Sequence, residues 1–274
     1  MSIKLICIDM DGTLLMDQQK VADEDKKAIK EAVEKGITVA ITTGRVYDCA
    51  RMYSDTIGLK TPIIACNGAY IGGANNEEIY NNPLKLEDLE DFNRITKKNN
   101  LFTYVNTNWG IISTKELPEN HVYKVLNRTL PEEERIRLEV VNDLDEAFKK
   151  YNGEILKGVC VEKEFKDNLR EAKEELIGCT TDLEIVSSWD DNFEIMKKGS
   201  SKGDAVKMLA KHLGVSQDEV MCIGDSENDL SMITWAGTGV AMGNAIDEVK
   251  KAANYVTSDN KHAGVAEAIR KFAL

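Results

Sequence analysis

The chain of 274 residues is long enough for one large domain or two smaller ones, and its 42% hydrophobic content excludes wholesale disorder. A formal net charge of −12 argues against nucleic acid or an anionic membrane as the main partner, although it is compatible with a local site for a small anion. The sequence has no apolar run that could span a bilayer and no basic-then-apolar signal pattern, so we expect a cytoplasmic protein. The six cysteines form no Cys-x-x-Cys pair, and we expect them to be reduced.

The first predicted strand, residues 5–8, ends in Asp9, Met10, Asp11 and Gly12. Alternate side chains of a strand point the same way, so Asp9 and Asp11 can leave its end together, while Gly12 allows a sharp turn. Two carboxylates this close repel each other unless a cation lies between them, and oxygen ligands suit a hard ion such as Mg²⁺. The alternative is a strand that ends in an ordinary Asx turn.

A parallel sheet wrapped by helices is predicted for the first part of the chain. Helices at residues 23–35 and 46–57 alternate with strands at 37–43 and 62–66, with short connections between them. The apolar face of the first helix is expected to comprise Ala28, Ile29, Ala32 and Val33.

The pattern changes in the middle of the chain, where an α+β insert of about 100 residues is predicted. Its expected elements are helices at 86–99, 144–151 and 164–176, a hairpin at 102–112, and strands at 158–161 and 183–186. The parallel-sheet pattern is expected to resume at Asn192. It continues with helices at 202–213, 228–235 and 265–272 and strands at 220–225, 239–242 and 255–256.

Four segments carry polar residues at the ends of their elements, where the loops of a parallel sheet converge. They are Asp9 with Asp11, then Thr43 with Gly44 and Arg45, then Lys202, and finally Gly224 to Asp229. One carboxylate can attack phosphorus while a second transfers protons. Mg²⁺ and fixed donors can stabilise the charge on the phosphoryl oxygens.

Each segment alone has an ordinary explanation. Thr43 and Gly44 can simply begin a loop, and residues 224–229 can be an acidic turn with a helix cap. Lys202 can be a solvated lysine, but the helix dipole disfavours a cation at a helix start, so a bound anion would explain it. Neither acidic stretch is an EF-hand, because the glycine required at position six is replaced by Leu14 or Leu230.

Taken together, the four segments resemble the motifs of the haloacid dehalogenase (HAD) superfamily. The whole chain resembles its Cof-type, YidA-like branch of sugar-phosphate phosphatases, which Asn67-Gly68-Ala69 and Ser200-Ser201-Lys202-Gly203 also fit. The resemblance implies an α/β fold: a HAD-like Rossmannoid parallel-sheet core with an inserted α+β cap of the C2B type. The expected core comprises residues 1–82 and 191–274, and the expected cap comprises residues 83–190.

The resemblance also implies a role for each motif residue. Asp9 would be the nucleophile and a Mg²⁺ ligand, and Asp11 would be the general acid and base, with its backbone carbonyl on the metal. Asp225 would complete the protein ligands of Mg²⁺, while Asp229 would orient Lys202 or a metal-bound water. The residues implied in holding phosphate are the Met10 backbone, Thr43, Gly44, Lys202 and Asn228. Those implied on the substrate side are Arg45 and Asn67.

Specificity is expected to reside in the cap. Its candidate contact residues are Tyr104, Asn106, Asn108, Trp109, His121 and Trp189. The alternative for each is a packing or surface role, which is the commoner use of aromatic residues in an α+β domain.

The sequence therefore predicts a Mg²⁺-dependent phosphatase of small phosphorylated metabolites, in particular sugar phosphates, acting through an aspartyl phosphate. The expected partner is the small substrate, without nucleic acid or membrane, and the expected assembly is a monomer or weak homodimer. The main alternative is a phosphosugar mutase of the phosphomannomutase type. A receiver-like phosphoacceptor module would need no inserted domain, and a pump of the same superfamily would need membrane spans.

Overall fold

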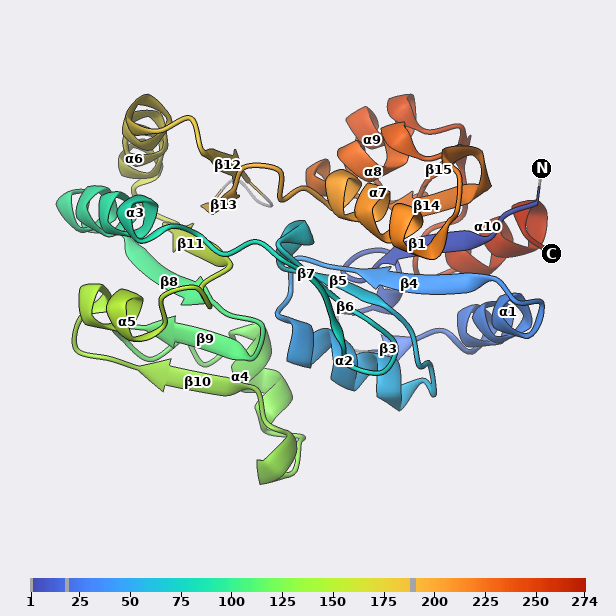
Figure 1. Ribbon diagram of the computed structural model, residues 1–274, viewed down its shortest axis with the longest axis horizontal. Coiled ribbons are helices and arrows are strands. Elements are labelled where there is room, and N and C mark those ends of the chain that lie inside the picture. Colours follow the sequence, from blue (N-terminus) through green and yellow to red (C-terminus); the bar gives the residue numbers. More distant parts are fainter. Residues whose placement is uncertain (1, 18–19, 188–190) are drawn as a thin grey trace. The chain divides into compact units, whose positions relative to one another are not determined.

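The computed structural model describes residues 2–17, 20–187 and 191–274, and the chain divides into two compact units (Figure 1). The first unit consists of Met1–Arg45, Tyr53–Tyr80 and Ser200–Leu274. The second consists of Val46–Met52 and Asn81–Gly199. The first unit is therefore built from both ends of the chain, with the second inserted between them.

The first unit is built on an eight-stranded sheet in the order β16-β15-β14-β1-β4-β5-β6-β7. The bounds are Leu5–Asp9 for β1, Thr38–Thr42 for β4, Ile63–Ala65 for β5, Tyr70–Gly72 for β6, Glu78–Asn81 for β7, Val220–Gly224 for β14, Thr238–Ala241 for β15 and Tyr255–Val256 for β16. The strands from β16 to β5 pair in parallel, while β6 pairs antiparallel to β5. The predicted α/β fold with a parallel-sheet core is confirmed, with an antiparallel extension at one side.

The middle of this sheet is formed by β1, with β14 on one side and β4 on the other. Every residue of β1 and β14 is buried, as expected for apolar strands covered on both faces. Cys7 of β1 lies opposite Cys222 of β14, and Asp9 lies opposite Thr42 of β4. The register thus brings the carboxyl ends of three strands to the same edge of the sheet.

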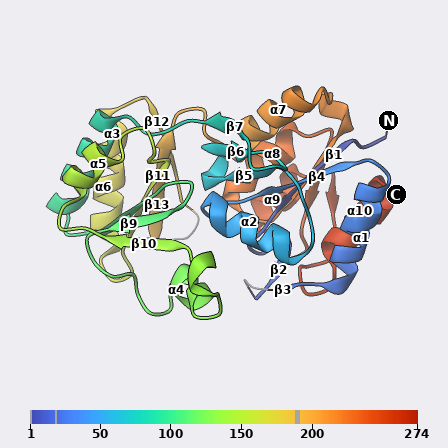
Figure 2. The ribbon, with the colours of Figure 1, turned by 60° about the horizontal axis from the view of Figure 1, so that its bottom comes forward.

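Helices cover this sheet (Figures 1 and 2). Their bounds are Asp23–Glu34 for α1, Lys202–Leu213 for α7, Leu230–Trp235 for α8, Asp247–Ala252 for α9 and Gly264–Phe272 for α10. A further helix, α2, Tyr47–Thr56, is divided between the two units after Met52. Two groups pack side by side, α1 with α10 and α7 with α8 and α9. Ala28, Ile29 and Ala32 of α1 are buried as predicted, but Val33 is 43% exposed and does not belong to the buried face.

The antiparallel extension was absent from the predicted pattern. A tight turn at Cys66–Gly68 reverses the chain between β5 and β6, with Asn67 in a left-handed conformation at φ 54°. A second small hairpin joins β2, Leu15–Met16, to β3, Lys20–Val21. Both hairpins have strands of two or three residues, too short for a recognisable alternation of apolar and polar positions.

The second unit contains a six-stranded sheet in the order β10-β9-β8-β11-β13-β12. The strand bounds are Phe102–Asn106 for β8, Gly110–Ser113 for β9, Arg137–Val140 for β10, Lys157–Val161 for β11, Leu183–Val186 for β12 and Asn192–Lys197 for β13. All pairs are antiparallel except β9 with β10. The helices are Leu86–Lys98 (α3), Val122–Asn127 (α4), Leu144–Lys150 (α5) and Lys166–Cys179 (α6).

One hydrophobic cluster holds the second unit together. It joins apolar side chains of α3, α5 and α6 to one face of the sheet, where Phe92 of α3 meets Phe193 of β13 edge to face at 6.2 Å between ring centroids. All members of the cluster lie between Leu84 and Ile195. This unit therefore has a core of its own, made from the inserted part of the chain.

One strand lies in a different sheet from the one predicted. Strand β13, Asn192–Lys197, pairs with β11 and β12 of the second unit, so the parallel pattern does not resume at Asn192. The first unit resumes at Ser200 instead. Residues 46–52 also belong to the second unit, where the Val46 N–H donates to the Tyr123 hydroxyl at 3.0 Å. The predicted elements also omitted α4, α9, β7 and β10.

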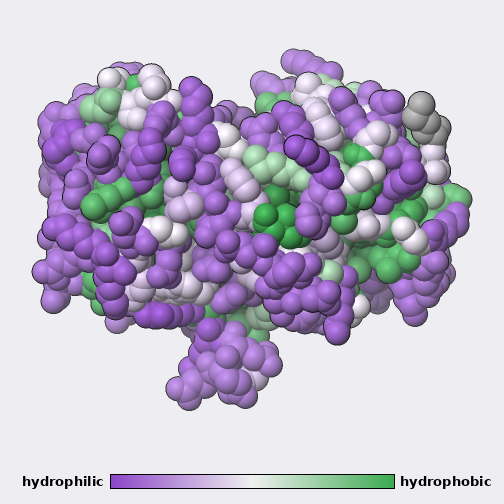
Figure 3. All heavy atoms as spheres, viewed as in Figure 1, coloured by the Kyte–Doolittle hydropathy of each residue, from purple (hydrophilic) through white to green (hydrophobic). Residues whose placement is uncertain are grey.

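The surface drawn in Figure 3 is largely hydrophilic, with smaller apolar patches between the hydrophilic residues. Among the described residues, no helix combines the length and the apolar character needed to cross a membrane.

Candidate active site

A buried lysine joins two carboxylates at the carboxyl edge of the first sheet. The Lys202 ammonium donates to Asp9 Oδ1 at 2.5 Å and to Asp229 Oδ1 at 2.6 Å, and all three side chains are less than a tenth exposed. Lys202 is the first residue of α7, whose N-cap is Ser201. The anions that explain a cation at this helix start thus include two carboxylates of the protein itself.

Asp229 fixes the backbone that carries a third carboxylate, that of Asp225. Its Oδ2 accepts the backbone N–H groups of Asp225 and Ser226, at 2.9 and 3.0 Å, while Lys202 occupies its Oδ1. Asp225 itself accepts from the Thr13 hydroxyl at 2.8 Å and the Ser226 hydroxyl at 3.1 Å. Both oxygens of Asp229 are therefore used inside the protein, whereas Asp225 stands nearer the loop that follows β1.

That loop turns at Gly12, which has φ +86°. A Cβ atom added at this position would clash with Asp225 Oδ2, so a larger residue would displace the carboxylate as well as strain the backbone. The Asn244 side chain donates to the Gly12 carbonyl at 2.8 Å and fixes the turn from outside. Gly12 is thus required both by its conformation and by its closeness to Asp225.

The charges of this cluster are unbalanced. Burial, and then repulsion from Asp229, raises the pKa of Asp9 well above its ordinary value, and the same two causes raise the pKa of Asp225 to about 6. Burial lowers the pKa of Lys202, but attraction to Asp229 and Asp9 outweighs it and the pKa is raised. One ammonium among three carboxylates leaves an excess of negative charge at the site.

The residues fit a hard divalent cation. Oxygens of Asp9, Asp225 and Asp229 lie within 4.8 Å of one another, and the three carboxylates with Lys202 sum formally to −2. Carboxylate oxygens are the preferred ligands of Mg²⁺. Because Asp229 is occupied by Lys202 and two backbone amides, Asp9 and Asp225 are the carboxylates best placed to bind the ion directly.

Asp11 is bound by an arginine. Arg45 Nε donates to Asp11 Oδ2 at 2.8 Å and Arg45 Nη2 donates to Oδ1 at 2.5 Å, a bidentate ion pair in which the Arg45 side chain is 5% exposed and that of Asp11 is 41% exposed. The Arg45 N–H also donates to Thr43 Oγ1 at 3.1 Å. The two predicted segments that contain Asp11 and Thr43 are thus connected through Arg45.

The remaining predicted residues lie around these groups in the same unit. The Asn67 N–H donates to the Thr43 carbonyl at 3.0 Å, and the Asn228 amide donates to Asn67 Oδ1 at 3.1 Å. The Met10 side chain is buried in the core and its carbonyl accepts from Leu15 at 2.8 Å, so only its backbone can serve a ligand. Gly44 is half-buried between Thr43 and Arg45.

The candidate contact residues of the second unit are mostly packing residues. Trp109 lies against the Tyr151 ring at 5.4 Å, under the Arg137 guanidinium at 4.2 Å, and its indole N–H donates to Glu154. His121 caps α4 by accepting from the Tyr123 N–H, and burial lowers its pKa to about 4.

Tyr104 meets the His121 ring edge to face at 5.6 Å. Asn108 is engaged through its backbone, because its carbonyl accepts the Asp48 N–H at 3.1 Å. Asn106 differs from the others, because it is 2% exposed and its Oδ1 has no hydrogen-bond partner among the described residues. Trp189 lies outside the described residues.

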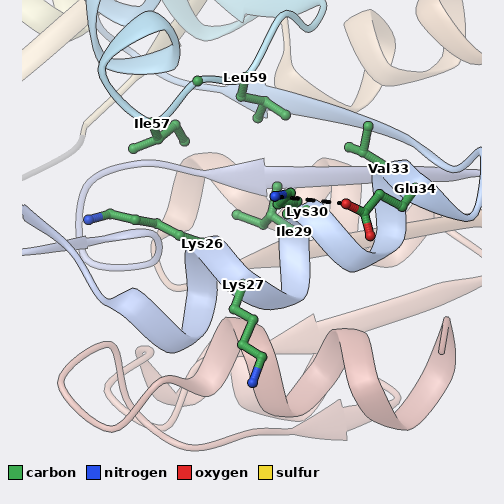
Figure 4. Close-up of a pocket in the computed structure, with 9 residues that line it drawn as sticks. Lys26, Lys27, Ile29, Lys30, Val33, Glu34, Ile57 and Leu59 are labelled. Carbon is green, nitrogen blue, oxygen red and sulfur yellow. Dashed lines mark ion pairs between the residues drawn. The ribbon is translucent and has the colours of Figure 1, made fainter.

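The first unit also has a hollow of about 480 Å³ that contains none of the motif residues. Ile29 and Val33 of α1 face Ile57 and Leu59 across it, and Lys30 pairs with Glu34 at its side (Figure 4). Lys27 extends away from these apolar side chains. The hollow therefore lacks a convergent set of polar groups, and we assign it no function.

Sequence reasoning missed several residues that support the site. Thr13 and Ser226 hold Asp225, Tyr53 lies 5.1 Å from the Arg45 guanidinium carbon, and Ser231 accepts the Gly203 N–H at 3.0 Å. Ser226 and Asp229 form a reciprocal capping box, and its Ser-x-x-Asp spacing is visible in the sequence. Ser231 has no local signal, because its partner Gly203 is distant in the chain, and Tyr53 belongs to no motif.

An α/β fold with a parallel-sheet core and an inserted second unit is the architecture that the resemblance to haloacid dehalogenase (HAD) hydrolases predicts. The family model described as haloacid dehalogenase-like hydrolase matches residues 6–269, and the chain belongs to this family. The predicted family and the predicted class of enzyme are both confirmed, since its relatives in this family are named phosphatases.

Two curated relatives and one solved structure illustrate the similarity. The chain is 35% identical over 272 residues to the 5-amino-6-(5-phospho-D-ribitylamino)uracil phosphatase YcsE of Bacillus subtilis, covering 99% of this chain and 96% of that protein. It is 30% identical over 274 residues to the pyridoxal phosphate phosphatase YbhA of Escherichia coli, covering 98% of each. A haloacid dehalogenase-like hydrolase of B. subtilis has a similar structure, with a TM-score of 0.86 and 29% identity over 98% of this chain and 99% of that one.

Proposed function

We propose that this enzyme is a Mg²⁺-dependent phosphatase that hydrolyses small phosphate monoesters through an aspartyl phosphate on Asp9. The observation that carries the proposal is the Lys202 ammonium bound to Asp9 beside Asp225 and Asp229. A lysine in this place neutralises the nucleophile and can also meet a phosphoryl oxygen. Nothing favours the mutase alternative, and the named relatives support hydrolysis.

In the first half of the reaction, a carboxylate oxygen of Asp9 forms a bond to phosphorus and the bond from phosphorus to the leaving oxygen breaks. Asp11, as the acid, donates a proton to that leaving oxygen. In the second half, a water oxygen attacks phosphorus, Asp11 takes up a water proton, and the bond between Asp9 and phosphorus breaks. Inorganic phosphate is released and both carboxyl groups return to their starting state.

The other residues of the site hold the phosphoryl group. We assign this role to Lys202, the Thr43 hydroxyl, Asn228 and the backbone N–H groups of Met10 and Gly44. A bound Mg²⁺, held by Asp9, the Asp11 carbonyl and Asp225, would supply positive charge against the phosphoryl oxygens. Asp229 keeps Lys202 and the Asp225 backbone in place.

We propose phosphorylated metabolites of the sugar-phosphate class as substrates. Support comes from YcsE, whose named substrate carries a phosphorylated ribityl chain, and YbhA, which is named for pyridoxal phosphate. We also propose a cytoplasmic location, as a monomer or weak homodimer. Residues 81–199 would serve as a cap that selects substrates, and the other unit would be the catalytic core.

The test is the substitution Asp9→Asn, assayed for phosphate release from a panel of sugar, nucleotide and pyridoxal phosphates. We expect turnover to fall by more than about 10³-fold, because the amide is a poor nucleophile, while the fold is retained. Asp247→Asn, an exposed position in α9, is the matched control and should leave turnover unchanged. Near-normal Mg²⁺-dependent activity in Asp9→Asn would refute the assignment of the nucleophile.

A further inference from the structure

Arg45 binds both oxygens of the Asp11 carboxylate through two nitrogens of its guanidinium group. Nε and Nη2 bind different oxygens of Asp11, at 2.8 and 2.5 Å. A bidentate pair of this kind fixes the plane of the carboxylate as well as its position, which a single hydrogen bond or a lysine cannot do. The Asp11 side chain is 41% exposed and directly precedes the turn at Gly12, so the orientation of its carboxylate depends on such a partner.

Arg45 is itself held on several sides. Its N–H donates to Thr43 Oγ1, and its carbonyl accepts the Cys66 N–H at 2.9 Å. Its guanidinium carbon lies 5.1 Å from the centre of the Tyr53 ring, within the range of a cation–π contact. With its side chain only 5% exposed, Arg45 is a rigid support.

We propose that Arg45 is a positioning residue that acts on the reaction through Asp11, by orienting its carboxylate to take the proton from water when phospho-Asp9 is hydrolysed. This inference rests on the proposed function. In the ion pair with Arg45, Asp11 is a carboxylate, which is its state after it has given its proton to the leaving group. A carboxylate is also what the second half of the reaction needs, because Asp11 must then accept a proton from water. The competing role is direct binding of the substrate phosphate by Arg45.

The two roles predict different kinetics with p-nitrophenyl phosphate, whose leaving group departs without much help from an acid. In Arg45→Gln, we expect the rapid first release of one equivalent of p-nitrophenolate to persist. Steady turnover should fall by about 10²-fold, because hydrolysis of phospho-Asp9 has lost its oriented base. Arg45→Lys should fall almost as far, since its ammonium cannot bind both oxygens in one plane.

A double-mutant cycle completes the test. If Arg45 acts through Asp11, adding Arg45→Gln to Asp11→Asn should change turnover by less than about twofold. Arg270→Gln, which breaks the surface pair with Glu24 at 2.8 Å, is the matched control and should leave both phases unchanged. Circular dichroism checks the fold of each variant, and Arg45→Lys replaces Arg45→Gln if the latter does not fold.

The outcomes separate this inference from the proposed function. A slower first release, a raised KM and an undiminished loss in the Asp11→Asn background would show that Arg45 binds substrate, and would overturn the inference alone. A wild-type enzyme that releases no p-nitrophenolate, or that releases it without phosphorylation of Asp9, would overturn the proposed function itself.

Discussion

At the residue scale, Lys202 is a buried cation held between two buried carboxylates. Its side chain is 1% exposed, and its ammonium is the cation that both Asp9 and Asp229 bind. Taking three charges out of water is costly, and direct hydrogen bonds among them offset that cost. Removing the lysine would leave two carboxylates buried without their cation.

We therefore predict that Lys202→Met lowers the free energy of unfolding by about 3–5 kcal/mol, besides abolishing turnover. Urea denaturation followed by circular dichroism measures the loss. Lys207→Met is the matched control on the same helix, because its pair with Asp204 is exposed to solvent and should contribute less than about 1 kcal/mol. Equal stability of the Lys202→Met variant and the wild type would contradict this account of the cluster.

Residue types and spacing predicted much of this site but not its internal contacts. The odd position of Lys202 at a helix start was a valid signal, because it indicated nearby anions. The pair between Arg45 and Asp11 has no such signal, since it depends on how far two loops reach beyond the ends of β1 and β4. Tyr53 likewise belongs to no motif, and it lies against Arg45 because of its position on α2.

At the scale of elements, α1 and α10 are joined through a buried acid. Asp25 of α1 is fully buried and accepts the Ala266 N–H of α10 at 2.7 Å, while its Oδ2 has no hydrogen-bond partner among the described residues. Burial raises the pKa of Asp25 to about 6. The charged form is thus disfavoured in the folded protein relative to the unfolded chain, where the ordinary value is 3.8.

The sign of the pH dependence follows from this shift. As pH falls from about 6 to about 4, the folded protein binds a proton at Asp25 before the unfolded chain does, so this residue's contribution to stability rises. Asp25→Asn should therefore stabilise the protein by on the order of 2 kcal/mol at pH 7 and by little at pH 4. Urea unfolding at both pH values measures the difference.

Asp23→Asn, on an almost fully exposed neighbour in the same helix, should change stability only slightly at either pH. A stabilisation by Asp25→Asn that is equal at pH 7 and pH 4 would show that charge is not the cause.

Sequence patterns located most of the long elements correctly. They did not show which of the two sheets an apolar strand belongs to, and β13 was assigned to the wrong one. Phe193 and Ile195 of β13 alternate with polar Asn192 and Glu194, the pattern of an antiparallel strand with one face in a core. Reading this strand as part of the parallel sheet ignored that alternation. The hairpin of β5 and β6 escaped prediction although its turn contains Asn67-Gly68. The loop spans residues 66–69 instead of two residues, and it joins strands of only three residues each.

At the scale of the whole molecule, the two units differ in how the chain builds them. The hydrophobic cluster of the second unit draws only on residues between Leu84 and Ile195, so residues 81–199 contain a complete core. We predict that this fragment folds alone, with a cooperative urea transition and a dispersed amide NMR spectrum. It should be somewhat less stable than the same unit in the whole chain, because it lacks Val46 and Asp48, whose N–H groups bind Tyr123 and Asn108.

Phe92→Ala in this fragment should cost about 3–5 kcal/mol, because the ring is fully buried against Phe193. Phe165→Ala, at a position 62% exposed in the same unit, is the control and should have little effect. A fragment without a cooperative transition would show that the unit depends on the rest of the chain.

The pairing of β1 with β14 has a consequence for the order of events during translation. Leu5 lies opposite Val220, so the edge of β1 that faces β14 has no native neighbour until more than two hundred further residues have left the ribosome. The inserted unit is complete some twenty residues earlier. We expect the inserted unit to fold first. Until β14 is synthesised, β1 has an unpaired edge, and partly folded chains with such edges are the intermediates on which chaperones act. Asp9 thus meets Lys202, Asp225 and Asp229 only after about two hundred further residues have been synthesised.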